Sequence, residues 1–331
     1  MAVTMADISK LRQMTGAGMM DCKKALTEAD NDIDVAIEIL RKKGQAVAAK
    51  REDRNASEGC VIAQSTGEYA AVVALNCETD FVGKNEGFVN LTKSILAAAV
   101  AAKAKSIDEV KALEINGQKV ADLIIEESGK TGEKMELGAF EYVEAPATIA
   151  YNHFGNKLAT LVSFNKAGLD EQVYKNVAMQ VAAMNPIAVD ECDVAEDVKE
   201  KEIAVAIEKT KAEQIQKAVE AALKKAGINP AHVDSEDHME SNKAKGWITD
   251  EDVAKAKEII ATVSAEKAAN LPEAMIQNIA KGRLGKFLKE VCLLNQEDVT
   301  GEDKKTVRET LKAVDAELKV LSFKRVNLNV D

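Results

Sequence analysis

GEYAAVVALN at residues 67–76 returns in altered form as GNKLATLVSFN at residues 155–165, so the chain contains an internal repeat. Each copy holds an apolar run that predicts a buried strand, and each follows a β-rich arm that predicts a hairpin. A helix follows each copy, at residues 88–102 and 173–184, and a later strand completes each, at residues 135–144 and 318–328. We therefore predict an α+β fold with two pseudo-symmetric modules, each a three-stranded antiparallel sheet covered on one face by helices.

The first copy ends in a turn of unusual composition, NCETDFVGKN at residues 76–85. A turn after a buried strand is ordinarily polar, yet this one carries Phe81 between Asp80 and Val82. The ring either folds back as a local plug or contacts a partner, because an exposed aromatic side chain buries a large area for few frozen rotors. The second copy has KAGL at residues 166–169 in the equivalent place. Because the scaffold is repeated and the turn is not, we take the turn as the candidate functional site.

The first 44 residues predict three short helices. Thr4 and Asp7 form a capping pair before the first helix, the sequence GAG at residues 16–18 ends it, and KKG at residues 42–44 closes the third. A bundle of this size suits a small docking head. The alanine-rich and charged residues 45–57 are predicted to be a linker.

A long helical insertion interrupts the second module at about residues 195–290. Two stripes of apolar residues at helical spacing predict an antiparallel coiled-coil hairpin: Ala212, Ile215, Val219, Ala222 and Ala226, and then Val253, Ala256, Ile260 and Val263. The polar residues 227–246 would form its tip, which either contacts a partner or extends into solvent. The predicted domains are residues 1–55, 56–146 and 147–331.

Composition narrows the classes of function. The 331 residues carry 44 Lys and Arg against 55 Asp and Glu, and a net charge of -11 disfavours direct binding to nucleic acid. The five cysteines are scattered without metal or disulfide spacing, which indicates a reducing compartment. Neither a signal peptide nor a membrane-spanning stretch is evident, so we expect a cytoplasmic protein that does not bind membranes.

The candidates for catalysis are weak, and we predict no catalytic residue, no metal and no cofactor. Cys77 beside Glu78 would need a nearby base to become a nucleophile, so a thiol-dependent enzyme is a remote alternative. His232 and His238 fit no defined metal spacing. The sequence GAG before Lys23 lacks the spacing and the preceding strand of a phosphate-binding loop.

Two segments carry a family resemblance: TGAGMMDCKKAL at residues 15–26 and NCETDFV at residues 76–82 closely resemble bacterial translation elongation factor Ts. The resemblance covers nearly all of the chain outside the helical insertion. It implies a ubiquitin-associated-like first bundle and a pseudo-symmetric core. The activity it implies is guanine-nucleotide exchange on the GTPase elongation factor Tu. A binding adapter that leaves nucleotide release unchanged is the alternative function.

The resemblance also assigns roles to residues. Asp80 and Phe81 would enter the GTPase beside its magnesium and phosphate site, and Thr79 and Val82 would shape the turn. The further partner contacts that it implies are Lys23 on the docking head, together with Gly132 and His153. Some relatives carry a further helical module at the carboxy terminus. The sequence stops at Asp331, just after the last predicted strand, so we expect no counterpart of that module here.

Overall fold

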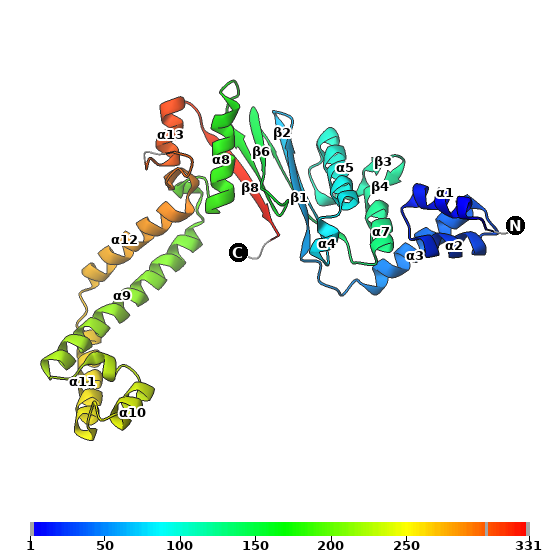
Figure 1. Ribbon diagram of the computed structural model, residues 1–331. Coiled ribbons are helices and arrows are strands. Elements are labelled where there is room, and N and C mark those ends of the chain that lie inside the picture. The colour runs from blue at the N-terminus through cyan, green and yellow to red at the C-terminus, as the bar shows by residue number, and fades with distance from the viewer. Residues whose placement is uncertain (1–2, 302–303, 329–331) are drawn as a thin grey trace. The chain divides into compact units, whose positions relative to one another are not determined.

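The computed structural model describes residues 3–301 and 304–328, which form two compact units (Figure 1). The first unit comprises the chain up to Val189 together with the part from Gln296 onward, and the second comprises Asp190–Asn295. The outermost ends of the predicted domains, residues 1–2 and 329–331, lie outside the described residues. The mixture of a helical bundle, small antiparallel sheets and long helices confirms the predicted α+β class.

The repeat in the sequence is a repeat in the fold. The first sheet has the order β1-β2-β5 and the second has the order β6-β7-β8, with every neighbouring pair antiparallel. The strands are β1 (Glu58–Ser65), β2 (Tyr69–Cys77), β5 (Glu136–Glu144), β6 (Ala147–Asn152), β7 (Leu158–Phe164) and β8 (Val320–Asn327). The register shifts at Ala74/Leu75 in the first sheet and at Ser163/Phe164 in the second, which are equivalent positions of the two copies. The predicted hairpins and late third strands are therefore confirmed.

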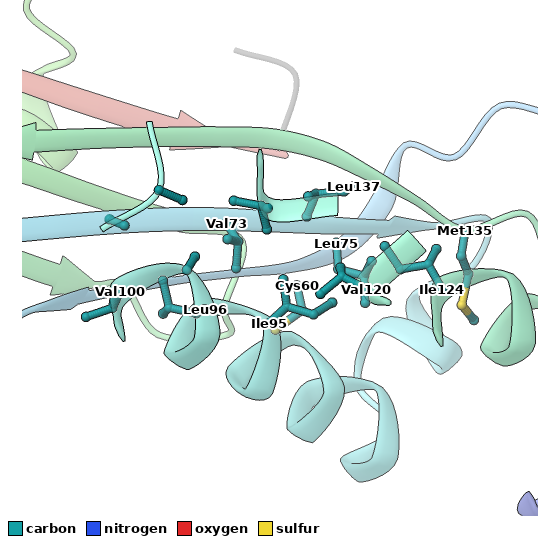
Figure 2. Packing of buried hydrophobic residues seen from close by; sticks show 14 of the residues in the cluster. Cys60, Val73, Leu75, Ile95, Leu96, Val100, Val120, Ile124, Met135 and Leu137 are labelled. Carbon is teal, nitrogen blue, oxygen red and sulfur yellow. The ribbon is translucent and has the colours of Figure 1, made fainter. Parts of the chain in front are cut away.

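Strand β2 is apolar throughout because both of its faces are covered. Tyr69, Val73 and Leu75 point towards the helices, where they join one buried cluster (Figure 2). Ala70, Val72 and Ala74 point the other way and pack in a second cluster that includes Leu161 of the other sheet. Small alanine side chains let the sheets approach closely. The prediction of one covered face thus requires a correction, because the second sheet covers the other face.

Helices cover the outer faces of both sheets. The first module carries α4 (Asp80–Gly83), α5 (Glu86–Ala102), α6 (Ile107–Ala112), the short strands β3 (Glu114–Ile115) and β4 (Gln118–Lys119), and α7 (Val120–Thr131). The second module carries α8 (Glu171–Met184) and α13 (Val307–Val314). Helix α5 contributes Phe88, Ile95 and Leu96 to the core beneath β2 (Figure 2).

The first helices form the expected bundle, but the third is longer than predicted. The helices are α1 (Met5–Thr15), α2 (Met19–Glu28) and α3 (Ile33–Lys50). Gly44, which was predicted to end α3, lies inside it and packs on α7 instead. A Cβ atom added to Gly129 of α7 would lie 2.4 Å from the Gly44 Cα. The pair of glycines is therefore a close helix contact, and part of the predicted linker is helical.

The second unit differs from a simple hairpin. It consists of α9 (Glu196–Lys225), α10 (Glu236–Ala244), α11 (Asp250–Ala269) and α12 (Glu273–Val291), and both α11 and α12 pack on α9. The returning arm is two helices because Pro272 precedes α12. Residues 227–246, predicted to be a polar tip, contain α10 and contribute Ile228, Val233 and Met239 to a local core.

The predicted seam along α9 is also wrong in part. Ala212 is exposed, whereas Ala206, Thr210 and Leu223 are buried. Over the described residues, no helix is both long and apolar enough to cross a membrane.

Candidate functional site

The turn after β2 is a single, well-capped turn of helix rather than a loop. Thr79 is the N-cap residue of α4, and its hydroxyl accepts a hydrogen bond from the Val82 N–H at 3.5 Å. The Phe81 side chain is 84% exposed and therefore does not act as a local plug. Of the two interpretations of Phe81, a local plug or a ring that contacts a partner, only the second is compatible with this exposure.

The other residues of α4 fix the turn to the first module. Val82 packs against the buried cluster beneath β2, so in the free protein it anchors the turn. Gly83 lies directly on β1, where an added Cβ would come within 2.9 Å of the Gly59 carbonyl oxygen. Asp80 is half-exposed and pairs with Lys84 at 2.6 Å, and this hydrogen bond holds the pKa of Asp80 below its usual range.

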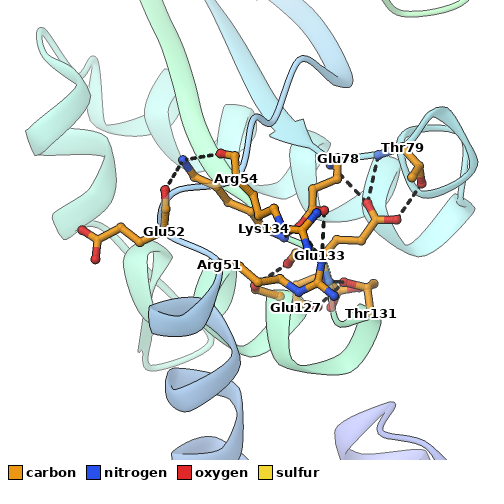
Figure 3. Close-up of polar contacts among 10 residues, drawn as sticks. Arg51, Glu52, Arg54, Glu78, Thr79, Glu127, Thr131, Glu133 and Lys134 are labelled. Atoms are coloured by element: carbon orange, nitrogen blue, oxygen red, sulfur yellow. Dashed lines mark hydrogen bonds and ion pairs between the residues drawn. The ribbon is translucent and has the colours of Figure 1, made fainter.

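Two glutamates, Glu78 and Glu133, lie at the start of the turn, and the sequence analysis predicted no such role for either (Figure 3). The Glu133 carboxylate accepts hydrogen bonds from the backbone N–H groups of Glu78 and Thr79, both at 3.1 Å. It also accepts one from the Thr79 hydroxyl at 2.6 Å. The Glu78 carboxylate accepts from the Arg51 guanidinium at 2.8 and 2.9 Å and from the Lys134 N–H at 2.7 Å. We call Glu78 and Glu133 the carboxylate clamp.

The structure places two other predicted residues in turns: Gly132 beside the clamp and His153 between β6 and β7. Gly132 ends α7 in the left-handed region, with φ of 76°, and directly precedes Glu133 of the clamp. His153 is exposed in the β6–β7 turn, where its Nδ1 lies 3.0 Å from the Tyr151 hydroxyl. This turn meets the start of β1, because the Val61 N–H donates to the Asn156 carbonyl at 2.7 Å.

The β6–β7 turn carries a second exposed ring that the sequence analysis missed. Phe154, next to His153, is 96% exposed. Lys157 of the same turn pairs with Glu58 and also contributes to lowering the pKa of Asp80, after the larger effect of Lys84. The structure thus brings the β6–β7 turn to the same edge of the first module as α4. An aromatic residue in a hairpin turn, beside the predicted His153, was the available signal.

Lys23 lies on the exposed side of α2, where Met19 and Met20 are also exposed. The adjoining residues 16–18 form the turn between α1 and α2. An added Cβ at Gly16 would lie 3.5 Å from the side chain of Lys130 in α7, so this turn packs against the first module. The bundle and the turn of α4 are therefore joined through the C-terminal end of α7, where Gly129 and Lys130 contact the bundle and the chain continues into Glu133 of the clamp.

The groups considered for catalysis serve other purposes. Cys77 is buried, burial raises its pKa to about 12, and its thiol donates to the Thr79 carbonyl at 3.1 Å. It is therefore a protonated support for the turn. His238 hydrogen-bonds to Asp234 at the far end of α9, and His232 stacks near Trp247 with ring centroids 5.5 Å apart.

A capped turn that presents a solvent-facing ring on a folded α+β scaffold is typical of proteins that bind a macromolecular partner. Comparisons with known sequences identify the family. The family described as elongation factor TS matches residues 78–226 and 203–329. The elongation factor Ts of Bacteroides thetaiotaomicron is 70% identical and that of Parabacteroides distasonis 68%, each over the whole of both chains. The counterpart in Porphyromonas gingivalis is 42% identical over the same span. The chain belongs to the elongation factor Ts family, whose members are translation elongation factors.

Proposed function

We propose that this protein is the guanine-nucleotide exchange factor for elongation factor Tu, that it binds the GDP-bound GTPase and that it speeds GDP release in the cytosol. The observation that carries the proposal is the exposure of Phe81 on a fixed turn. The family resemblance supplies its destination, the magnesium and phosphate site of the GTPase. Asp80 would enter this site together with Phe81, and Thr79 and Val82 would shape the turn. Lys23, Gly132 and His153 would contribute further contacts.

The mechanism follows from thermodynamic linkage. A factor that binds the nucleotide-free GTPase more tightly than the loaded form must lower nucleotide affinity by the same coupling free energy. Such a factor forms no covalent bond and has no preference of its own between GDP and GTP. It is therefore an exchange factor that acts through protein–protein contact and not an enzyme in the usual sense.

Phe81 alone cannot supply the whole effect. Burial of a phenylalanine side chain in a partner pocket contributes about 1.5–3 kcal/mol. That energy corresponds to roughly a tenfold to hundredfold change in rate. The rest has to come from the broader docking surface, which includes the bundle that carries Lys23.

The test is the release of fluorescent GDP from elongation factor Tu in a stopped-flow instrument. We expect Phe81→Ala to bind the GTPase and to release GDP roughly tenfold or more slowly. Leu321→Ala is the matched control, because it removes a large side chain that is 51% exposed on β8, and it should exchange at the wild-type rate. Full activity of Phe81→Ala would refute the role of the ring. Wild-type protein that binds the GTPase without accelerating release would instead be an adapter.

A further inference from the structure

Thr79 is held at all of its polar groups. Its N–H and hydroxyl both donate to Glu133, at 3.1 and 2.6 Å. Its carbonyl accepts from the Cys77 thiol and from the Gly83 N–H, both at 3.1 Å. Because Thr79 is the N-cap of α4, its position sets the direction in which Phe81, two residues later, leaves the module.

Glu133 reaches this point from another part of the chain. It comes just after α7 and its C-cap Gly132. Its carboxylate accepts hydrogen bonds from Glu78 and Thr79, which lie 55 and 54 positions earlier in the chain. A carboxylate only accepts hydrogen bonds, and three donors converge on the two oxygens of Glu133. Its neighbour Lys134 is tied down in turn, since its ammonium donates to the carbonyls of Glu52 and Arg54 at 3.0 and 3.1 Å (Figure 3).

The second glutamate of the clamp approaches from the other side of the same peptide. The Glu78 N–H donates to Glu133, while the Glu78 carboxylate accepts from Arg51 just beyond α3. The residue before the N-cap is thus bonded both to the segment that follows the docking bundle and to the segment that follows α7. These contacts fix the base of α4 in the absence of any partner.

We infer that Glu133 is a positioning residue for nucleotide exchange: it holds Thr79, and through it Phe81, in the orientation that enters the GTPase. The inference rests on the proposed function. It adds that exchange depends on a group that does not itself need to touch the partner. Geometry of this kind matters because a displacement of about 1 Å at a reacting group can cost a hundredfold in rate.

The free protein gives a first test that needs no GTPase. The amide protons of Glu78 and Thr79 both donate to Glu133, so in Glu133→Ala their hydrogen exchange, measured by NMR, should become at least about tenfold faster. Glu114→Ala removes an exposed carboxylate of the same module and should leave both amides as in the wild type. Unchanged protection of these amides in Glu133→Ala would overturn the inference whatever the function of the protein.

The second test measures GDP release over a range of factor concentrations. In Glu133→Ala the maximal rate should fall about tenfold, whereas the half-saturating concentration should stay within about twofold, because the docking bundle is intact. Thr79→Val, which removes the hydroxyl that bonds Glu133, should lower the maximal rate in the same way. A loss confined to the half-saturating concentration would assign Glu133 to docking and contradict the inference.

A double-mutant cycle separates positioning from a general effect on folding. If Glu133 acts through the ring, then Phe81→Ala with Glu133→Ala should be no slower than Phe81→Ala alone. Multiplying losses would show that Glu133 acts elsewhere. Should Glu133→Ala fail to fold, Glu133→Gln keeps the size of the side chain and presents an N–H group to the converging donors, and it enters the same cycle. If the wild-type protein does not accelerate GDP release from elongation factor Tu, the proposed function is refuted. The hydrogen-exchange test of the Glu78 and Thr79 amides still applies in that case.

Discussion

Replacing Gly129 by alanine should force α3 and α7 apart and loosen the docking bundle from the first module. The new Cβ would lie 2.4 Å from the Gly44 Cα, about 1 Å closer than the 3.4 Å at which ordinary van der Waals contact begins. Both groups belong to helix backbones, so a side-chain rotation cannot relieve the overlap. Overpacking of this kind costs about 1–3 kcal/mol. The gain in helix propensity from glycine to alanine returns about 1 kcal/mol.

The expected net loss is therefore up to about 2 kcal/mol, which corresponds to opening that is up to roughly thirtyfold faster. Native-state hydrogen exchange of amides in α3 and α7 is the suitable assay, because a protein of two units is not expected to unfold in one step. Amides in β2, which is buried within the first module, should be protected as in the wild type.

The same contact supplies a matched control. An added Cβ at Gly44 would meet the Ile125 carbonyl oxygen at 3.3 Å and the Gly129 Cα at 3.6 Å, so Gly44→Ala should be tolerated far better than Gly129→Ala. Gly285→Ala in α12 meets nothing within 4 Å and should stabilise its helix by about 0.5–1 kcal/mol. Equal protection of α3 and α7 in the two bundle variants would refute the reasoning from close contact.

Two further predictions concern the ionisable groups. Cys192 is the exposed cysteine, whereas Cys22, Cys60, Cys77 and Cys292 are buried with raised pKa values, so a thiol reagent at pH 8 should modify one group rapidly and Cys192→Ser should abolish that phase. The pKa of Glu78 is held below its ordinary value of 4.5, chiefly by the Lys134 N–H and then by Arg51. A carboxyl group whose pKa is lowered by folding stabilises the protein at pH values above its ordinary pKa. The difference in unfolding free energy between wild type and Glu78→Gln, measured with urea, should therefore be constant from about pH 7 to 5. It should shrink as the pH falls below 4.5.

Much of the scaffold was predictable because local signals agreed with the tertiary structure. The apolar run of β2 and its echo in β7 gave the two hairpins, and capping residues such as Thr4 gave the first helices. The same reasoning failed where a residue had two possible uses. A glycine after two lysines, as at Gly44, is typical of a helix end. Here Gly44 instead lies inside α3 and contacts Gly129 of α7, a contact that the local sequence does not reveal.

The exposed residue of the candidate site, Phe81, could be predicted from the sequence, whereas the residue that holds the turn, Glu133, could not. Phe81 is conspicuous because an aromatic residue in a polar turn breaks a local rule. Glu133 breaks none, since a glutamate after a helix is ordinary, and its bonds to Glu78 and Thr79 span more than fifty residues. Contacts of that range leave no periodicity or spacing in a single sequence.

The two copies of the repeat show why the ring needs such support. Both central strands shift register near their C-terminal ends and then turn, but the second copy closes its turn locally. There the Tyr174 hydroxyl donates to the Lys166 carbonyl at 3.0 Å, and the Tyr174 ring packs edge-on against Phe164 at 4.7 Å. Tyr174 belongs to α8, and its buried ring helps to hold the turn that precedes this helix.

In the first copy the ring points outward and contributes no such burial to the free protein. The work of holding the turn therefore falls to groups from elsewhere, the Glu133 carboxylate above all. The second copy fixes its turn with Tyr174 from the helix that follows, whereas the first keeps the ring of its turn exposed and fixes the turn by charge-assisted hydrogen bonds to Glu133. Because the backbones of the two copies share one plan, this difference in support distinguishes the turn of α4 from the equivalent turn at residues 166–169.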